Sequence, residues 1–242
     1  MEKIDRTGEI TYNSFGSEMI IKEYRNNRDI NVYFPKYNWL GEHVHYTQFK
    51  HGTLKCPYEP RVFGKGYIGE GKYSYKDHKI YKNWERMLRR CYSEKFHEDF
   101  PTYKECECER LLCLQDFGKW HNKNYYEIEG EVICLDKDIL CKGNKIYSPE
   151  TCIYVPEKIN KLFSGNINGV SWDKNRNKWA VQMNVHSKHK HFGRYDSYEK
   201  ARQVYKENKE KYMKEVIDSY KGKIPKDIYE KLQKAIYNYI IE

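Results

Sequence analysis

The sequence has few apolar residues and no long apolar run. Apolar residue types make up 39% of the chain, whereas charged residues make up 33%. No run approaches the roughly 20 apolar residues of a membrane-spanning helix, so we expect no membrane span. The N-terminal segment MEKIDRTGEI lacks the apolar stretch of a secretory signal, so we expect a cytoplasmic protein whose thiols are reduced.

Aromatic residues compensate for the low apolar content. The chain has 24 Tyr, 9 Phe and 5 Trp, and each of these rings buries a large area when it packs. Low hydrophobicity with high charge favours disorder, but this aromatic content is sufficient for several small cores. We therefore predict a folded α+β protein whose 242 residues form several small modules.

Two common site motifs are missing. Cys106, Cys108 and Cys113 are closely spaced, but no second C-x(2–4)-C pair completes a structural zinc site. Zinc and buried free thiols are the alternatives, and the sequence favours the thiols.

The Gly-rich stretch 64–71 has neither the Lys-Ser/Thr step nor the following helix of a phosphate-binding loop. We interpret residues 57–78 as an ordered linker or a loop that packs along the backbone.

Positive charge is concentrated at the C-terminal end of the chain. The formal net charge is +9, and residues 164–242 hold 17 Lys and Arg against 10 Asp and Glu. A basic segment of this kind suits a polyanion, because each phosphate that it neutralises releases condensed counterions. The alternative is a basic surface that is simply solvated.

The first half of the chain predicts a sheet followed by helices. Residues 1–56 read as a small β module, with strands in EITYNSF, MIIKEY and DINVYF and a further strand at 45–49. Apolar residues at three- and four-residue spacing then predict helices over 79–91 and 110–122. A last helix is expected within 221–242, where its apolar stripe serves either packing or self-association.

Residues 132–163 have the order strand, loop, strand, helix. The segment reads VICLDKDILCKGNKIYSPETCIYVPEKINKLF, with strands predicted at 132–135 and 152–155. Pro156 is well placed to begin a helix that continues to residue 162. This order resembles the ββα-metal motif of HNH endonucleases, including those of phages and mobile introns. We expect a helical plus HNH-like region over 79–163.

The resemblance implies a set of catalytic roles. Asp136 and Asn160 match the metal ligands, and Asn144 matches the loop asparagine that orients the general base. One carboxylate and one amide oxygen suit Mg²⁺ or Mn²⁺, which would stabilise the leaving oxygen of a phosphodiester. The position of the base itself is Lys137, where the family has histidine.

The lysine leaves the chemistry open. A lysine of ordinary pKa is protonated at neutral pH and is a poor base. Lys137 therefore stabilises charge while water activated by the metal attacks, or His121 supplies the base, or the site is inactive. A further alternative is that Asp136 and Asn160 only satisfy nearby backbone groups.

The C-terminal third predicts three strands and a helix. Strands are expected at 170–173 and 178–185, and a third follows the turn Ser187-Lys188 and runs to Gly193. Ser197 is a good N-cap for a helix that begins at Tyr198. The second strand alternates, with Trp179, Val181, Met183 and Val185 on its inner face. We expect this sheet-plus-helix domain to cover residues 164–220.

This segment resembles the ethylene-response-factor type of DNA-binding domain, which is also found attached to phage HNH endonucleases. The matching residues are Gly169-Val170, Lys178-Trp179-Ala180, Phe192-Gly193-x-Tyr195-Asp196 and Glu199-x-Ala201 with Tyr205. The resemblance implies that the sheet enters the major groove. The residues expected to contact DNA are Ser171, Lys174, Arg176, Lys178, Gln182, Asn184, Lys188, His189, Lys190, His191 and Arg194.

Within that set the chemistry predicts two roles. The amides of Gln182 and Asn184 suit adenine, whose N6 and N7 pair with an amide in a bidentate manner. Exposed Lys and Arg at the edges would contact phosphate and fix the register. The alternative is an ordinary sheet whose polar face is solvated.

The two resemblances together imply a sequence-recognising DNA endonuclease with one divalent metal and double-stranded DNA as its partner. If the chain is phage-encoded, it would act in the bacterial cytoplasm. One alternative is a catalytically inactive DNA-binding or regulatory protein on a degenerate HNH scaffold. Another is a phage inhibitor that binds a host protein.

Overall fold

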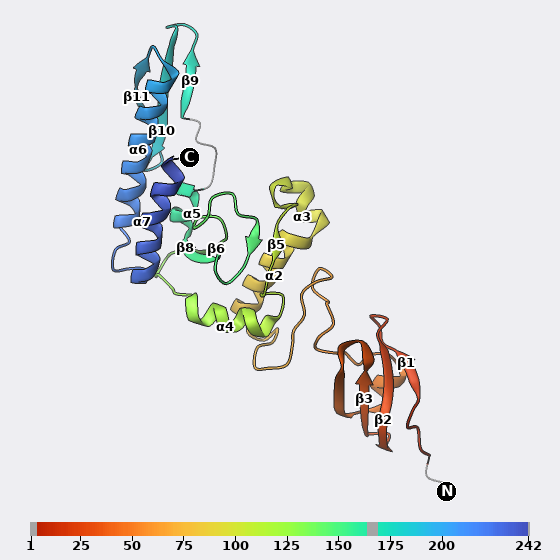
Figure 1. The fold of residues 1–242 in the computed structure, drawn as a ribbon. Helices are drawn as coiled ribbons and strands as arrows, with labels where there is room; N and C mark the ends of the chain where they lie inside the picture. The colour runs from red at the N-terminus through yellow and green to blue at the C-terminus, as the bar shows by residue number, and fades with distance from the viewer. Residues whose placement is uncertain (1–3, 164–168, 242) are drawn as a thin grey trace. The chain divides into compact units, whose positions relative to one another are not determined.

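The computed structural model describes residues 4–163 and 169–241, and these form the α+β fold that the sequence predicts (Figure 1). Residues 1–3, 164–168 and 242, at the ends of predicted segments, lie outside the described residues. The contacts divide the chain into two units, Met1–Phe96 with Leu112–Gly118, and His97–Leu111 with Lys119–Glu242. Within the described residues, no helix combines the length and the apolar character needed to cross a membrane.

The first unit begins with a four-stranded antiparallel sheet. Its strands β1 (Ile10–Tyr12), β2 (Glu18–Asn26), β3 (Asp29–Phe34) and β4 (Trp39–Val44) pair in chain order, with a 3-10 helix η1 (Pro35–Tyr37) before β4. Residues of β2 and β3 fill its core, including Ile21, Ile30 and Val32.

The prediction of a strand at 45–49 is wrong. These residues belong to helix α1 (Tyr46–Lys50), and β4 lies before it in the chain. Tyr46 and Phe49 are buried three residues apart, which is a helical and not a strand spacing. The side chain of Gln48 also accepts a hydrogen bond from the backbone N–H of His45 at 3.3 Å, which fixes the first turn.

The Gly- and Tyr-rich segment 57–78 is a packed loop of the first unit. It lies against helix α2 (His78–Tyr92), whose buried stripe includes Trp84, Met87 and Leu88, as the helical spacing predicts. A Cβ atom on Gly66 would lie 2.2 Å from Leu88 Cδ1, so only glycine allows this close approach.

The helix predicted over 110–122 begins later than expected. Helix α4 covers Leu114–Asn124, because Arg110 has a left-handed φ of 60° that ends any helical run there. Residues before it form β5 (Glu107–Cys108), which pairs in parallel with β7 (Ile146–Tyr147). The short helices α3 (Glu94–Asp99) and η2 (Pro101–Tyr103) precede β5.

The predicted strand–loop–strand–helix order is confirmed in the second unit. Strand β6 (Ile133–Asp136) pairs antiparallel with β8 (Ile153–Pro156), and helix α5 (Glu157–Phe163) packs on both strands. Pro156 closes the strand and the helix begins one residue later, a shift of one position from the prediction.

The C-terminal sheet has the three predicted strands, but the third begins at Lys188, within the predicted turn, and extends beyond its predicted end at Gly193. Its strands are β9 (Val170–Asp173), β10 (Lys178–Val185) and β11 (Lys188–Tyr195), in the spatial order β11-β10-β9. Ser197 caps helix α6 (Tyr198–Asp218), because its Oγ accepts a hydrogen bond from the backbone N–H of Lys200 at 3.1 Å.

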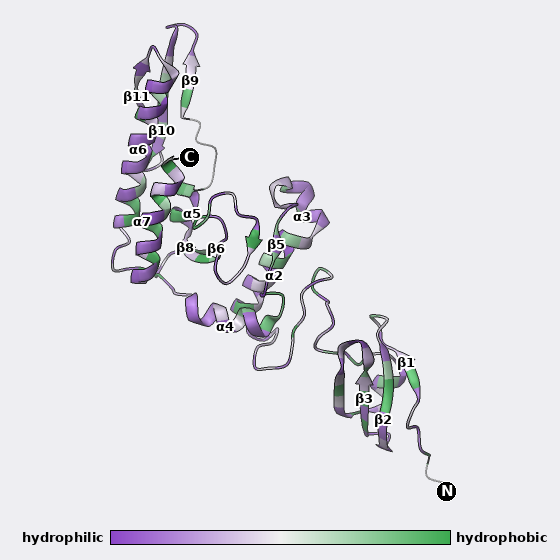
Figure 2. Cartoon of the chain, in the orientation of Figure 1, coloured by the Kyte–Doolittle hydropathy of each residue, from purple (hydrophilic) through white to green (hydrophobic). Residues whose placement is uncertain are grey.

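Helix α6 is shared by two cores. Its first half packs Ala201 and Tyr205 against the inner face of the sheet, which includes Val181. Its second half packs with helix α7 (Lys226–Ile241) and with the β8 and α5 side chains Val155 and Ile159. Figure 2 shows mainly hydrophilic residues along α6, so its contacts with both cores use narrow apolar stripes.

The cap of α6 gives a direct test of this arrangement. Ser197→Ala removes the side-chain oxygen that accepts the Lys200 N–H, and we expect the free energy of unfolding to fall by about 1 kcal/mol. Urea denaturation followed by circular dichroism would measure the change. Ser197→Asp retains a capping oxygen and serves as the control, and equal losses in both variants would contradict the role of the cap.

Candidate functional site

The outward face of the C-terminal sheet carries most of the residues expected to contact DNA. Gln182 pairs with His191 and Asn184 with His189, so these four side chains lie on one face. Their neighbours in β10, Val181 and Met183 among them, are buried against α6 on the other face. The predicted alternation is therefore confirmed, except that Ala180 is buried although it belongs to the outward face.

One imidazole lies between two amides at the centre of this face. His189 Nε2 lies 2.6 Å from Gln182 Oε1, and its Nδ1 lies 3.4 Å from Asn184 Oδ1. The backbone N–H of Gly193 donates to His191 Nδ1 at 2.9 Å, so the Nε2 atom of a neutral His191 carries the proton. The face thus presents two amides and a ring N–H, all suited to hydrogen bonding.

A carboxylate fixes two of the predicted phosphate ligands. Asp173 Oδ2 accepts hydrogen bonds from Arg194 Nε at 2.8 Å and from Arg176 Nη1 at 3.3 Å. The Arg194 bond is the main reason why the pKa of Asp173 lies below its usual value. Lys178 Nζ likewise lies 3.0 Å from Asp196 Oδ1. These side chains are thus held in place, and part of their charge is neutralised.

The remaining predicted residues are exposed, but they do not share one face of the sheet. Lys174 is exposed in the turn between β9 and β10, and Ser171 is exposed on β9. Lys188 and Lys190 pair with Val185 and Met183, so they belong to the face that α6 covers. Both are exposed on the edge strand β11. Their side chains therefore start from the face of the sheet opposite to Gln182 and Asn184.

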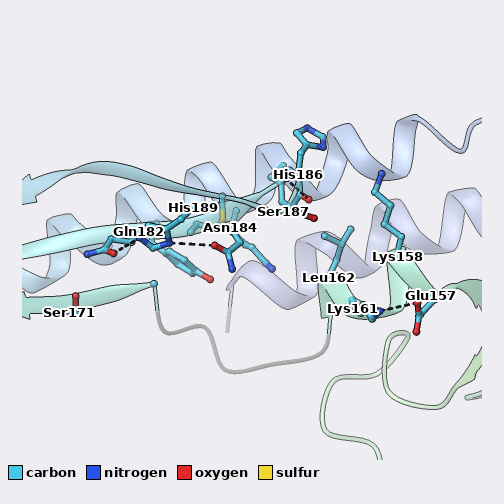
Figure 3. Close-up of a pocket in the computed structure, with 15 residues that line it drawn as sticks. Glu157, Lys158, Lys161, Leu162, Ser171, Gln182, Asn184, His186, Ser187 and His189 are labelled. Atoms are coloured by element: carbon cyan, nitrogen blue, oxygen red, sulfur yellow. Dashed lines mark hydrogen bonds and ion pairs between the residues drawn. The ribbon is translucent and has the colours of Figure 1, made fainter.

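A groove of about 1110 Å³ lies between the sheet and α5 (Figure 3). Gln182, Asn184 and His189 line it from the sheet, and Lys158 and Lys161 line it from α5. The remaining lining residues are Glu157, Leu162, Gly169, Ser171, Met183, His186, Ser187, Tyr205, Lys209 and Tyr212. Lys158 and Lys161 were not predicted as site residues, although their three-residue spacing places them on one helical face.

The loop after β6 contains the ββα residues predicted for catalysis. Asp136 Oδ1 accepts the backbone N–H groups of Asp138 at 2.8 Å and Ile139 at 2.9 Å. Burial, followed by the nearby charge of Asp138, raises the pKa of Asp136 to about 6. Asn144 Nδ2 donates a hydrogen bond to the backbone carbonyl of Lys137 at 2.7 Å. The loop asparagine therefore contacts the backbone of Lys137, the residue at the position of the general base.

Neither candidate base faces solvent. Lys137 is only 7% exposed, and its Nζ lies 3.4 Å from Asp138 Oδ2, under 6 Å from the ring centres of Tyr103 and Tyr147. His121 is 2% exposed, and its Nδ1 lies 2.7 Å from the hydroxyl of Tyr154. Both side chains are held in the interior, where a DNA strand has little access.

The predicted metal ligands differ in how well their polar atoms are satisfied. Asn160 Oδ1 is buried and has no hydrogen-bond partner among the described residues, which is costly for an amide oxygen. Asp136 lies on β6, against which α5 packs. One carboxylate and one amide oxygen fit a hard ion that keeps most of its waters. Among the described residues, no group of three or more His, Cys, Asp or Glu side chains is placed to hold a metal ion.

The three closely spaced cysteines are buried. Cys106, Cys108 and Cys113 form no disulfide. Burial raises the pKa of Cys108 to about 12, so this thiol is protonated at neutral pH.

Comparisons with protein-family models, curated proteins and solved structures gave no match to this chain. Function is therefore inferred from the geometry of the outward face, the groove and the loop after β6.

Proposed function

We propose that this protein binds double-stranded DNA through the outward face of β9, β10 and β11. The observation that supports this most directly is the pair of amides, Gln182 and Asn184, whose side-chain oxygens lie 2.6 and 3.4 Å from the ring nitrogens of His189. Polar side chains ordered in this way enter a complex with little further loss of rotamer freedom. Exposed cations on the same sheet, and the excess of positive charge in residues 164–242, suit a polyanionic partner.

The dimensions and chemistry of the face suit the major groove. A two-stranded ribbon fits that groove, and β10 and β11 form a hairpin of eight residues per strand. Gln182 and Asn184 would each bind an adenine edge. Lys174, Lys188 and Lys190 would contact phosphates on either side and set the position of the sheet.

The amides should decide sequence preference. Gln182→Ala with Asn184→Ala should weaken binding to a selected duplex by roughly 30-fold or more, because each good bidentate contact contributes about 1–3 kcal/mol of discrimination. Binding to random duplex should change little. Fluorescence anisotropy, on a site first selected from a random duplex pool, would measure both affinities.

The matched control is Gln203→Ala, which removes an exposed amide on α6 that bonds Glu207. This variant should bind the selected site as the intact protein does. The proposal fails if the intact protein does not bind duplex DNA, or if the control loses as much affinity as the double variant.

Hydrolysis of a phosphodiester at the ββα loop is a second candidate function. It is favoured by the buried, unsatisfied Oδ1 of Asn160, on a helix that packs against the strand of Asp136. The burial of Lys137 and His121 favours the alternative, a DNA-binding protein that has the nuclease outline without the chemistry. The DNA-binding proposal is compatible with either outcome.

A metal titration separates these two alternatives. If Asp136 and Asn160 bind a divalent ion, Mg²⁺ or Mn²⁺ should raise the melting temperature of the intact protein, and Asp136→Asn or Asn160→Ala should abolish the increase. Plasmid cleavage with the same ions should be lost in both variants while DNA binding remains. Differential scanning fluorimetry and gel electrophoresis give the two readouts.

Asp99→Asn provides the control, because it removes an exposed carboxylate of α3 outside the loop. It should leave both the metal response and cleavage unchanged. No metal response and no cleavage by the intact protein, with tight DNA binding, would support the inactive alternative.

A further inference from the structure

A half-buried lysine of α6 has no anionic partner in the groove. Lys209 lines the groove, and no ion pair or hydrogen bond of its ammonium is present among the described residues. Burial alone shifts the pKa of Lys209 below its ordinary value, and no carboxylate contributes to the shift. Partial burial of a cation without a counterion is unfavourable, and a bound anion would relieve this cost.

The rest of the groove is also cationic. Lys158 and Lys161 of α5 line the groove, and the only carboxylate among its lining residues is that of Glu157. Glu157 is engaged by Lys161, with an Nζ to Oε2 distance of 2.9 Å (Figure 3). Lys158 and Lys209 are therefore not neutralised by a lining carboxylate. The lining carries an excess of positive charge.

The amides of the outward face line the same groove. β9 pairs with β10 only as far as Val181, and the N–H of Gln182 then donates to the carbonyl of Gly169 at 2.7 Å. Beyond this point Gln182 and Asn184 contribute to one wall of the groove, and α5 contributes to the other. A DNA strand whose bases meet these amides would pass beside the lysines.

We propose that this groove binds the sugar–phosphate backbone of the duplex that the sheet reads, with Lys209, Lys158 and Lys161 as its phosphate ligands. The inference rests on the proposed function and extends the DNA contact from the sheet onto α5.

The salt dependence of binding tests the role of Lys209. Each phosphate contact contributes about 0.9 to the slope of log K against log salt concentration for duplex DNA. Lys209→Gln keeps much of the aliphatic stem, and we expect it to reduce that slope by about 0.9. Lys211→Gln is the matched control, because Lys211 is exposed on the same helix and does not line the groove. It should leave the slope nearly unchanged.

A second variant on another element guards against misfolding. Lys158→Gln with Lys161→Gln changes two exposed side chains of α5 and should reduce the slope by about one to two. Ethylation interference on the selected duplex should show phosphate contacts that disappear in this variant. The contacts made by the sheet should remain.

Three outcomes would be decisive against the inference. If the intact protein binds duplex with a preference that depends on Gln182 and Asn184, but the groove variants behave as Lys211→Gln does, the groove proposal fails alone. If the intact protein binds no DNA, the proposed function fails as well. If the groove variants alter binding of a single-stranded oligonucleotide or of inorganic phosphate but not of duplex, the duplex assignment is wrong.

Discussion

The burial of two apolar stripes on one helix is the constraint on which the second unit depends. Helix α6 has 21 residues, and Tyr205 in its first half packs in the core of the sheet. Ile217 in its second half packs in a core that includes β8, α5 and α7. Backbone hydrogen bonds fix the residues of a continuous helix relative to one another, so α6 also fixes the position of one core relative to the other. The groove lined by α5 and the sheet exists because α6 holds both of its sides.

Local patterns predict much of this unit, because its elements are specified by short-range rules. Strand β10 alternates between buried and polar residues, and the predicted bounds of β9 and β10 agree with the structure. The hydroxyl of Ser197 marks the start of α6 by satisfying a backbone N–H of the first turn. The strand prediction at 45–49 is wrong because the three-residue spacing of Tyr46 and Phe49 buries both side chains on one face of a helix.

The features that could not be predicted from the sequence depend on packing between residues far apart in the chain. The pairing of β5 with β7 joins residues about 40 positions apart in the chain, and no short pattern specifies it. The position of Lys137 after β6 was predictable, but the direction of its side chain was not. Tyr103 and Tyr147, which flank its ammonium, come from distant segments. Lys209 likewise lines the groove only because α6 packs with both α5 and β10.

Asn160 and Lys209 have opposite demands. Among the described residues, Asn160 Oδ1 is a buried acceptor without a donor, whereas Lys209 is a half-buried cation without a carboxylate. The two residues lie on α5 and α6, which contact each other. An apolar ligand would satisfy neither group, and a neutral polar ligand would leave the lysine uncompensated. A phosphodiester strand would compensate Lys209, and a divalent cation would compensate Asn160, so the proposed DNA backbone site and the candidate metal ligands Asp136 of β6 and Asn160 of α5 are compatible with each other.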